Sequence, residues 1–276
     1  MEPFIISLDW SNPQPQITRA VIIFHGVGRD VEGYYRTLLK AADSASSAAQ
    51  GTVFIAPQFL DEEDIGPHRI PRDVLRWHGT DRESGEPAIK PIHVSSYEVV
   101  DILLARLADH SLFPNLHTVV LAGHSGGGQL VHRYAIVGRA LPTLSTSGVH
   151  LRFVIANPSS YVYFSDDRPG ASGARAWLFR RGDCPHFNHW KYGTIHPPAY
   201  VKLDADNSWQ QVEANYAQRD VIYLLGTADT DREEKDLDVS CGGEAQGPRR
   251  FARAEKQDEP APEVDPSELP ADEPTT

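Results

Sequence analysis

The residues best suited to chemistry form the pentapeptide Gly-His-Ser-Gly-Gly at positions 123–127. In the pattern glycine, any residue, serine, any residue, glycine, the serine lies on a sharp turn between a strand and a helix. The apolar residues 118–122 before it are typical of a strand, and residues 127–141 after it are typical of a helix. The pattern therefore predicts that Ser125 is a nucleophile at a helix N-terminus, where the helix dipole favours negative charge. The alternative is a glycine-rich turn with an incidental serine.

A second glycine-rich segment, His-Gly-Val-Gly at positions 25–28, follows another strand-like run. Acyl transfer needs two backbone amides that converge on the oxyanion of the tetrahedral intermediate. We predict that Gly126 provides one amide and Val27 the other, with Gly26 as the alternative to Val27. A dinucleotide-binding loop is excluded, because its pattern requires glycine where this chain has Val31.

An acidic residue follows the last apolar run, residues 221–225. Asp229 is the candidate for the carboxylate that orients a catalytic base, and Asp231 is the alternative. A charged surface loop is the competing interpretation of this acidic segment.

With these segments the chain resembles the α/β-hydrolase superfamily over about residues 3–250. The resemblance rests on HGVGRD (25–30), GHSGGG (123–128), ANPSSY (156–161), WKYG (190–193) and YLLGTADTD (223–231). It implies an α/β fold with a mostly parallel central sheet flanked by helices. It further implies a serine esterase-like hydrolase with Ser125 as nucleophile, Asp229 as acid, a small-molecule acyl or ester substrate and no cofactor.

The sequence departs from that superfamily in its histidines. The superfamily order is serine, acid, histidine, but the last of the twelve histidines is His196, so none follows Asp229. The further strand and C-terminal helix are also missing from the pattern after Asp229. We interpret the change of composition after about Arg253 as a lost or replaced C-terminus, through truncation or an altered reading frame.

Three explanations of the missing base remain open. It could come from His186, His189 or His196, or from another chain, or be absent. In the last case the protein is catalytically impaired and binds a small apolar ligand. We expect the His124 side chain to face away from the serine and His25 to pack beneath the oxyanion loop.

Strand-like and helix-like segments alternate along the chain, which predicts a parallel α/β sheet with right-handed crossovers. A domain over residues 1–251 is expected to contain them. Strands are expected at residues 4–8, 20–25, 52–56, 118–122, 151–156 and 221–225, and helices at 32–49, after Ser95 or Ser96, and at 127–141. Residues 58–93 contain four prolines and are expected to be mainly loop.

Two segments differ in composition from the alternating part. Residues 157–220 hold eleven of the 25 aromatic side chains, which indicates either a lid that walls a pocket or a loop layer with ordinary core aromatics. Residues 252–276 hold eight acidic residues, two basic residues and five prolines. This composition predicts a disordered acidic, proline-rich tail.

The overall composition limits the partners. A net charge of −12 argues against nucleic acid, and no apolar run approaches the ~20 residues of a membrane span. Without a visible signal peptide we expect a cytoplasmic protein. Two free thiols are then favoured over one disulfide between Cys184 and Cys241. A zinc site at Cys184, His186 and His189 is the weaker alternative to ordinary polar residues, and no metal is expected.

Overall fold

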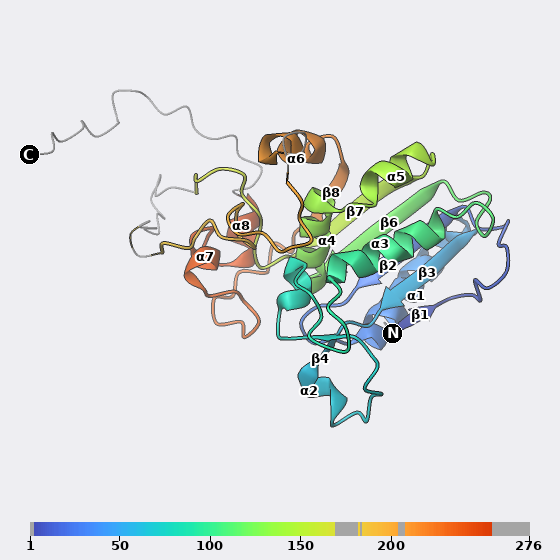
Figure 1. Ribbon diagram of the computed structural model, residues 1–276, viewed down its shortest axis with the longest axis horizontal. Coiled ribbons are helices and arrows are strands. Elements are labelled where there is room, and N and C mark those ends of the chain that lie inside the picture. The colour runs from blue at the N-terminus through green and yellow to red at the C-terminus, as the bar shows by residue number, and fades with distance from the viewer. Residues whose placement is uncertain (1–2, 169–181, 183, 204–207, 256–276) are drawn as a thin grey trace, which may run out of the picture.

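The computed structural model describes residues 3–168, 182, 184–203 and 208–255. A six-stranded sheet in the order β1-β3-β2-β6-β7-β8 forms its centre (Figure 1). The strands are β1 (Phe4–Ile6), β2 (Arg19–Phe24), β3 (Thr52–Pro57), β6 (Thr118–His124), β7 (His150–Ala156) and β8 (Asp220–Leu224). Only β1 is antiparallel to its neighbour, so the expected mostly parallel sheet is confirmed.

The central strands form because their β-branched and apolar residues can be covered on both faces. Ile22, Val119 and Leu121 are completely buried. Strand β2 pairs with β6 so that Phe24 lies opposite Gly123. This register brings the ends of the two strands, and the glycine-rich segments that follow them, to the same edge of the sheet.

Helices and short elements connect the strands. They are α1 (Val31–Ala45), α2 (Glu62–Ile65), α3 (Ser96–Leu107), α4 (Gly126–Val137), α5 (Leu141–Thr146), α6 (Trp209–Tyr216), α7 (Cys241–Glu244) and α8 (Arg250–Glu255), with the 3-10 turns η1 (Ser46–Ala49) and η2 (Asp81–Ser84) and a small sheet of β4 (Leu60–Asp61) and β5 (Arg76–Trp77). Ser95 caps α3 in a reciprocal capping box with Glu98, which stabilises the helix start.

The direction of the crossovers determines where a site can form. The chain passes from β2 through α1 to β3 on one side, whereas α3 and α4 lead from β3 to β6 and from β6 to β7 on the other. Right-handed crossovers in opposite directions place their helices on opposite faces of the sheet. The loops after β2 and β6 therefore diverge at a topological switch point, the usual position of a ligand crevice in such sheets.

Several boundaries differ from the sequence-based expectation. The helix expected over residues 127–141 ends at Val137, because the backbone of Gly138 is extended. Gly138 lies so close to the Tyr134 ring that an added Cβ would be 2.7 Å from it. Residues 58–93, expected to be mainly loop, contain β4, α2, β5 and η2.

The C-terminal end of the domain also differs. Helix α8 runs across the expected domain boundary at residue 251 and continues to Glu255, and its Arg253 is fully buried. Helices α7 and α8 follow Asp229, where no helix was expected, and they lie together in Figure 1 at the end of the molecule away from β1. Within the described residues no strand pairs with β8 other than β7. Residues 256–276 of the expected tail lie outside the described part.

The described aromatic side chains of residues 157–220 pack against the domain. Tyr200 belongs to the main core and meets Tyr97 edge-on at 5.2 Å, and Trp190 stacks on Trp209 at 6.0 Å between ring centroids. These contacts favour a layer of core aromatics over a lid. Trp177 and Phe179 lie outside the described residues.

Candidate active site

Ser125 occupies a tight turn between β6 and α4. Its backbone has φ 56° and ψ −121°, a left-handed conformation that costs a residue with a side chain of order 1–3 kcal/mol. The turn is fixed by two hydrogen bonds, from the Ser125 amide to the Ala156 carbonyl and from the Gln129 amide to the Ser125 carbonyl, both 2.9 Å. A Cβ on Gly127 would lie 2.1 Å from the Phe24 carbonyl oxygen, so the close packing of α4 on β2 requires glycine there.

The loop after β2 lies directly beside this turn. A Cβ added to Gly26 would lie 3.4 Å from the Ser125 Cβ, and one added to Gly126 would lie 3.1 Å from Val27 Cγ1. The two residues predicted as amide donors, Gly126 and Val27, are therefore neighbours beside the serine. Gly126 opens α4, so its amide has no acceptor within the helix.

A pocket of about 230 Å³ opens at the serine. It is lined by Gly26, Val27, Gly28, Asp30, Tyr34, His124, Ser125, Asn157, Asp229, Glu234, Asp236 and Arg250. Two of the predicted site residues, Val27 and Asp229, share it with Ser125, whereas Gly126 and the alternative acid Asp231 are not among its lining residues. Of the described residues within 157–220, Asn157 alone lines this pocket.

Asp229 is held by an arginine that the sequence did not suggest. Its carboxylate lies 3.6 Å from the Arg250 guanidinium, which also pairs with Glu234 at 2.7 Å. Arg250 further donates to the Ser159 hydroxyl and to the Asp236 carbonyl. The residue sits at the start of α8, which no pattern in the sequence placed near the serine. Asp229 thus makes an ion pair where the superfamily pattern predicts an imidazole.

His124 is the one histidine among the described residues that lines the pocket. Its Nδ1 lies 3.1 Å from the Tyr34 hydroxyl, so the ring bonds to Tyr34 and not to the serine that precedes α4. Burial lowers the pKa of His124, and the nearby Arg250 lowers it further against the opposing charge of Asp229. The ring is therefore neutral near pH 7.

The other candidate histidines lie elsewhere. His186 Nδ1 and His189 Nε2 are 3.3 Å apart, and the His196 ring lies 4.7 Å from that of His189. None of the three lines the serine pocket, so the structure does not place an insertion histidine over Ser125. They hold no site for a metal: the described residues contain no group of three ligands able to bind one.

His25 packs beneath the loop as expected. Its Nε2 accepts a hydrogen bond from the Phe59 amide at 3.0 Å, and its Nδ1 donates to the Gly26 carbonyl at 2.9 Å. Burial, with a contribution from Arg82, lowers the pKa of His25 to about 3. The neutral ring therefore connects the loop after β2 to the chain after β3.

A buried charged network supports the turn from below, and no sequence pattern indicated it. Arg82 donates to the Gly26 carbonyl at 3.0 Å, and Glu83 accepts from Gln129 of α4 at 2.9 Å. A Cβ on Gly126 would lie 2.3 Å from Glu83 Oε1, so the carboxylate packs directly against the head of α4. Burial raises the pKa of Glu83 in spite of the neighbouring Arg82 and Arg133. The turn η2 thus holds both glycine-rich segments.

The two cysteines form a disulfide, contrary to the expectation of free thiols. Cys184 and Cys241 are joined across a sequence separation of 57 residues. The bond occupies the thiol that a zinc site at Cys184 would need. No described helix is long and apolar enough to cross a bilayer.

The architecture is the α/β-hydrolase fold. The chain is similar to poly(aspartic acid) hydrolase-1 from Sphingomonas sp. KT-1, with 18% identity, 92% of this chain and 82% of that chain covered, and a TM-score of 0.53. It is also similar to LpqC, a poly(3-hydroxybutyrate) depolymerase from Bordetella parapertussis, with 20% identity, coverage of 92% and 75%, and a TM-score of 0.54. In sequence, no family model and no curated protein matches this chain.

Proposed function

We propose that this protein hydrolyses small acyl esters through Ser125. The observation that carries the proposal is the left-handed backbone of Ser125, φ 56°, at the head of α4 in a pocket shared with Asp229. A serine in that conformation presents its hydroxyl above the sheet at a cost in conformational energy. The two similar structures support hydrolysis of acyl compounds in general, because one is named a poly(aspartic acid) hydrolase and the other a poly(3-hydroxybutyrate) depolymerase.

In the proposed reaction Ser125 Oγ attacks the ester carbonyl carbon, and the alcohol leaves as the acyl group is transferred to the serine. Water then attacks the acyl-serine and releases the carboxylic acid. The negative oxygen of each tetrahedral intermediate accepts hydrogen bonds from the Gly126 and Val27 amides, with the N-terminal dipole of α4 adding to the stabilisation.

The rate of this reaction depends on the base. Among the described residues no imidazole bonds to the Ser125 hydroxyl, and Asp229 pairs with Arg250. A serine hydroxyl without a base is a poor nucleophile near neutral pH. Loss of the histidine from a comparable protease triad lowers kcat on the order of 10⁶-fold. We therefore expect slow turnover from the serine and its amide donors alone.

The size of the pocket favours small substrates. Four carboxylates and one guanidinium face a space of about 230 Å³, from Asp30, Asp229, Glu234, Asp236 and Arg250. A space of this size accommodates an acyl group as small as acetate better than a long alkyl chain.

The test is turnover of p-nitrophenyl acetate together with fluorophosphonate labelling. Wild type is compared with Ser125→Ala and with Ser44→Ala, a matched control whose hydroxyl donates to the Lys40 carbonyl within α1. We expect slow turnover and labelling in wild type and Ser44→Ala, and neither in Ser125→Ala. Equal activity in all three proteins would refute the proposal, and absence of labelling in all three would support the non-catalytic alternative.

The source of any base is tested with single substitutions. His124→Gln removes the one histidine of the described pocket, and His186→Gln, His189→Gln and His196→Gln remove those of the separate cluster. With no base, all four variants keep the wild-type rate within about twofold. A large loss in one of them would identify that histidine as the base and overturn the expectation of slow, unassisted turnover.

A further inference from the structure

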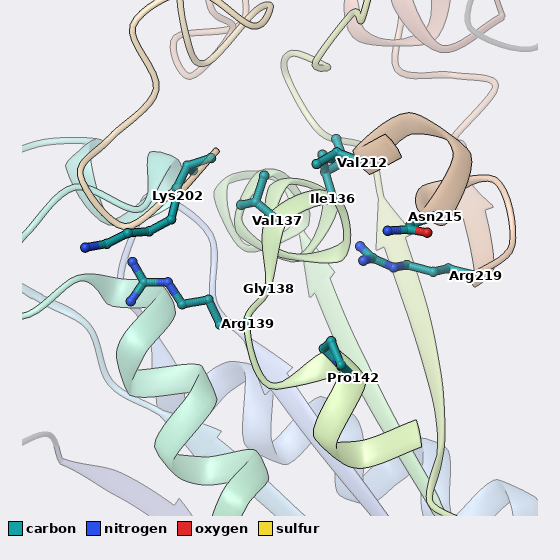
Figure 2. A pocket seen from close by; sticks show the side chains of 10 residues that line it. Ile136, Val137, Gly138, Arg139, Pro142, Lys202, Val212, Asn215 and Arg219 are labelled. Carbon is teal, nitrogen blue, oxygen red and sulfur yellow. The ribbon is translucent and has the colours of Figure 1, made fainter. Parts of the chain in front are cut away.

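A second and larger cavity lies at the far end of α4. It has a volume of about 530 Å³ and is formed where α4 ends, before α5, and by the segment around α6 (Figure 2). Ile136 of its lining is eleven residues from Ser125 along the helix, roughly 16 Å at ~1.5 Å per residue. The volume is in the range of small-molecule sites, and the cavity is separate from the serine pocket.

Arg219, which lines this cavity, is a partly buried arginine whose guanidinium differs from those of the buried arginines. Its guanidinium makes no hydrogen bond or ion pair within the described residues, and its Nη1 is buried without a partner. Arg133, by contrast, is fully buried and donates to the Glu83 carbonyl, Gln129 and Ser160. Burial lowers the pKa of Arg219 to about 10, so the group stays charged near pH 7. Burial of Nη1 without a hydrogen-bond acceptor is unfavourable, and an anion bound there would supply the acceptor.

The rest of the cavity supplies an apolar wall. Ile136 and Val212 are almost completely buried and belong to one apolar cluster. Figure 2 shows their side chains, with that of Val137, between the Arg219 and Asn215 groups on one side and Arg139 and Lys202 on the other.

The charges of the residues that line the cavity favour a negatively charged ligand. Its described residues include three cationic side chains and no carboxylate, although the protein carries a net charge of −12. Arg139 is already engaged, since it stacks on Tyr200 at 4.1 Å and pairs with Glu98 at 3.7 Å. Lys202 is engaged as well. Of the three cations, Arg219 is the one whose guanidinium makes no hydrogen bond or ion pair within the described residues.

We propose that this cavity binds a small amphiphilic anion, a carboxylate on a short alkyl chain. Arg219 and the Asn215 amide hold the carboxylate, for which a planar guanidinium is well suited. Ile136, Val137 and Val212 pack against the alkyl chain. The site is independent of Ser125 and of the reaction proposed for it.

The test is calorimetric titration of the full chain with octanoate, octanol and acetate. We expect saturable binding of octanoate, and binding at least tenfold weaker for octanol, which lacks the charge, and for acetate, which lacks the chain. Arg219→Gln should weaken octanoate binding by about tenfold to a hundredfold, the usual range for loss of a charged hydrogen bond. Arg36→Gln on the surface of α1 is the matched control, and Arg36→Gln and Ser125→Ala should bind as wild type does.

A thermal measurement distinguishes binding from a general loss of structure. Because Arg219 is unpaired, the thermal midpoint of Arg219→Gln without ligand should equal or exceed that of wild type. Octanoate should raise the thermal midpoint of wild type but not that of Arg219→Gln. Arg219→Lys, which keeps the charge, serves in its place if the glutamine variant does not fold and should bind more weakly than wild type. The proposal is overturned if octanoate does not bind, if octanol or acetate binds equally well, or if neither Arg219 variant changes the affinity.

Discussion

Breaking the Cys184–Cys241 disulfide should destabilise the domain strongly. The bond closes a loop of 57 residues that contains β8 and Asp229. The chain-entropy relation for such a loop gives about 14 cal/mol/K, or about 4 kcal/mol at 25 °C, through the added freedom of the unfolded chain. Small domains are stable by only about 5–15 kcal/mol in total, so a loss of this size is a large fraction of the stability.

Urea unfolding measures the effect. The oxidised protein, the reduced protein and the double variant Cys184→Ser with Cys241→Ser are compared by circular dichroism. We expect the reduced and double-variant forms to share one midpoint, lower than that of the oxidised form. Addition of reductant to the double variant is the control for direct effects of the reagent. A difference in unfolding free energy below about 1 kcal/mol would refute the loop argument, and two titratable thiols in the protein purified without reductant would refute the pairing itself.

Three further outcomes follow from the described contacts. The pKa of His25 and of His132 is lowered by burial to about 3, whereas an unfolded chain binds these protons near pH 6.5. Stability is therefore complete above pH 6.5 and is lost as the pH falls towards 3, by about 2 kcal/mol for each ring at pH 5. Ser125→Gly should raise the free energy of unfolding by about 1 kcal/mol, because glycine adopts φ 56° without strain. Deletion of residues 254–276 cuts α8 and should lower the melting midpoint, whereas deletion of 256–276 should leave it unchanged.

Each of these outcomes has its own control. For the pH effect, His25→Gln and His132→Gln are titrated by chemical denaturation, and an unchanged slope between pH 5 and pH 7 in both variants would contradict the assignment. Ser125→Ala keeps the strained backbone. If it raised the free energy of unfolding as much as Ser125→Gly does, backbone strain would not be the cause. For the tail, equal midpoints of the two deletions would show that the last two residues of α8 contribute nothing.

The turn at Ser125 could be predicted from sequence because its causes are local. Small residues at positions 123, 126 and 127 are needed for a left-handed residue packed against β2, and they stand beside the serine in the chain. The sheet and the position of Asp229 after a late strand followed from patterns of the same short range. The helix end at Gly138 was missed because it depends on how the Tyr134 ring packs.

The parts that could not be predicted depend on contacts between distant segments. Arg250 meets Asp229 through the fold of α8, and Glu83 reaches Gln129 across 46 positions. Neither pair has a sequence signature, since single charged residues are most often solvated surface groups. The disulfide was missed for a similar reason: the compartment argument favoured free thiols, and separation along the chain says nothing of distance in space.

The open side of β8 has a consequence for how the protein behaves in concentrated solution. Among the described residues β8 pairs only with β7, and Leu224 and Ile222 on this strand are 51% and 37% exposed. The outer edge therefore offers backbone donors and acceptors beside apolar side chains, which is the arrangement that templates the addition of another strand. Asp220, paired with His150 and Arg152, places charge at only one end of the strand. We therefore expect the concentrated protein to aggregate through this edge. Ile222→Lys should reduce this aggregation, as measured by light scattering.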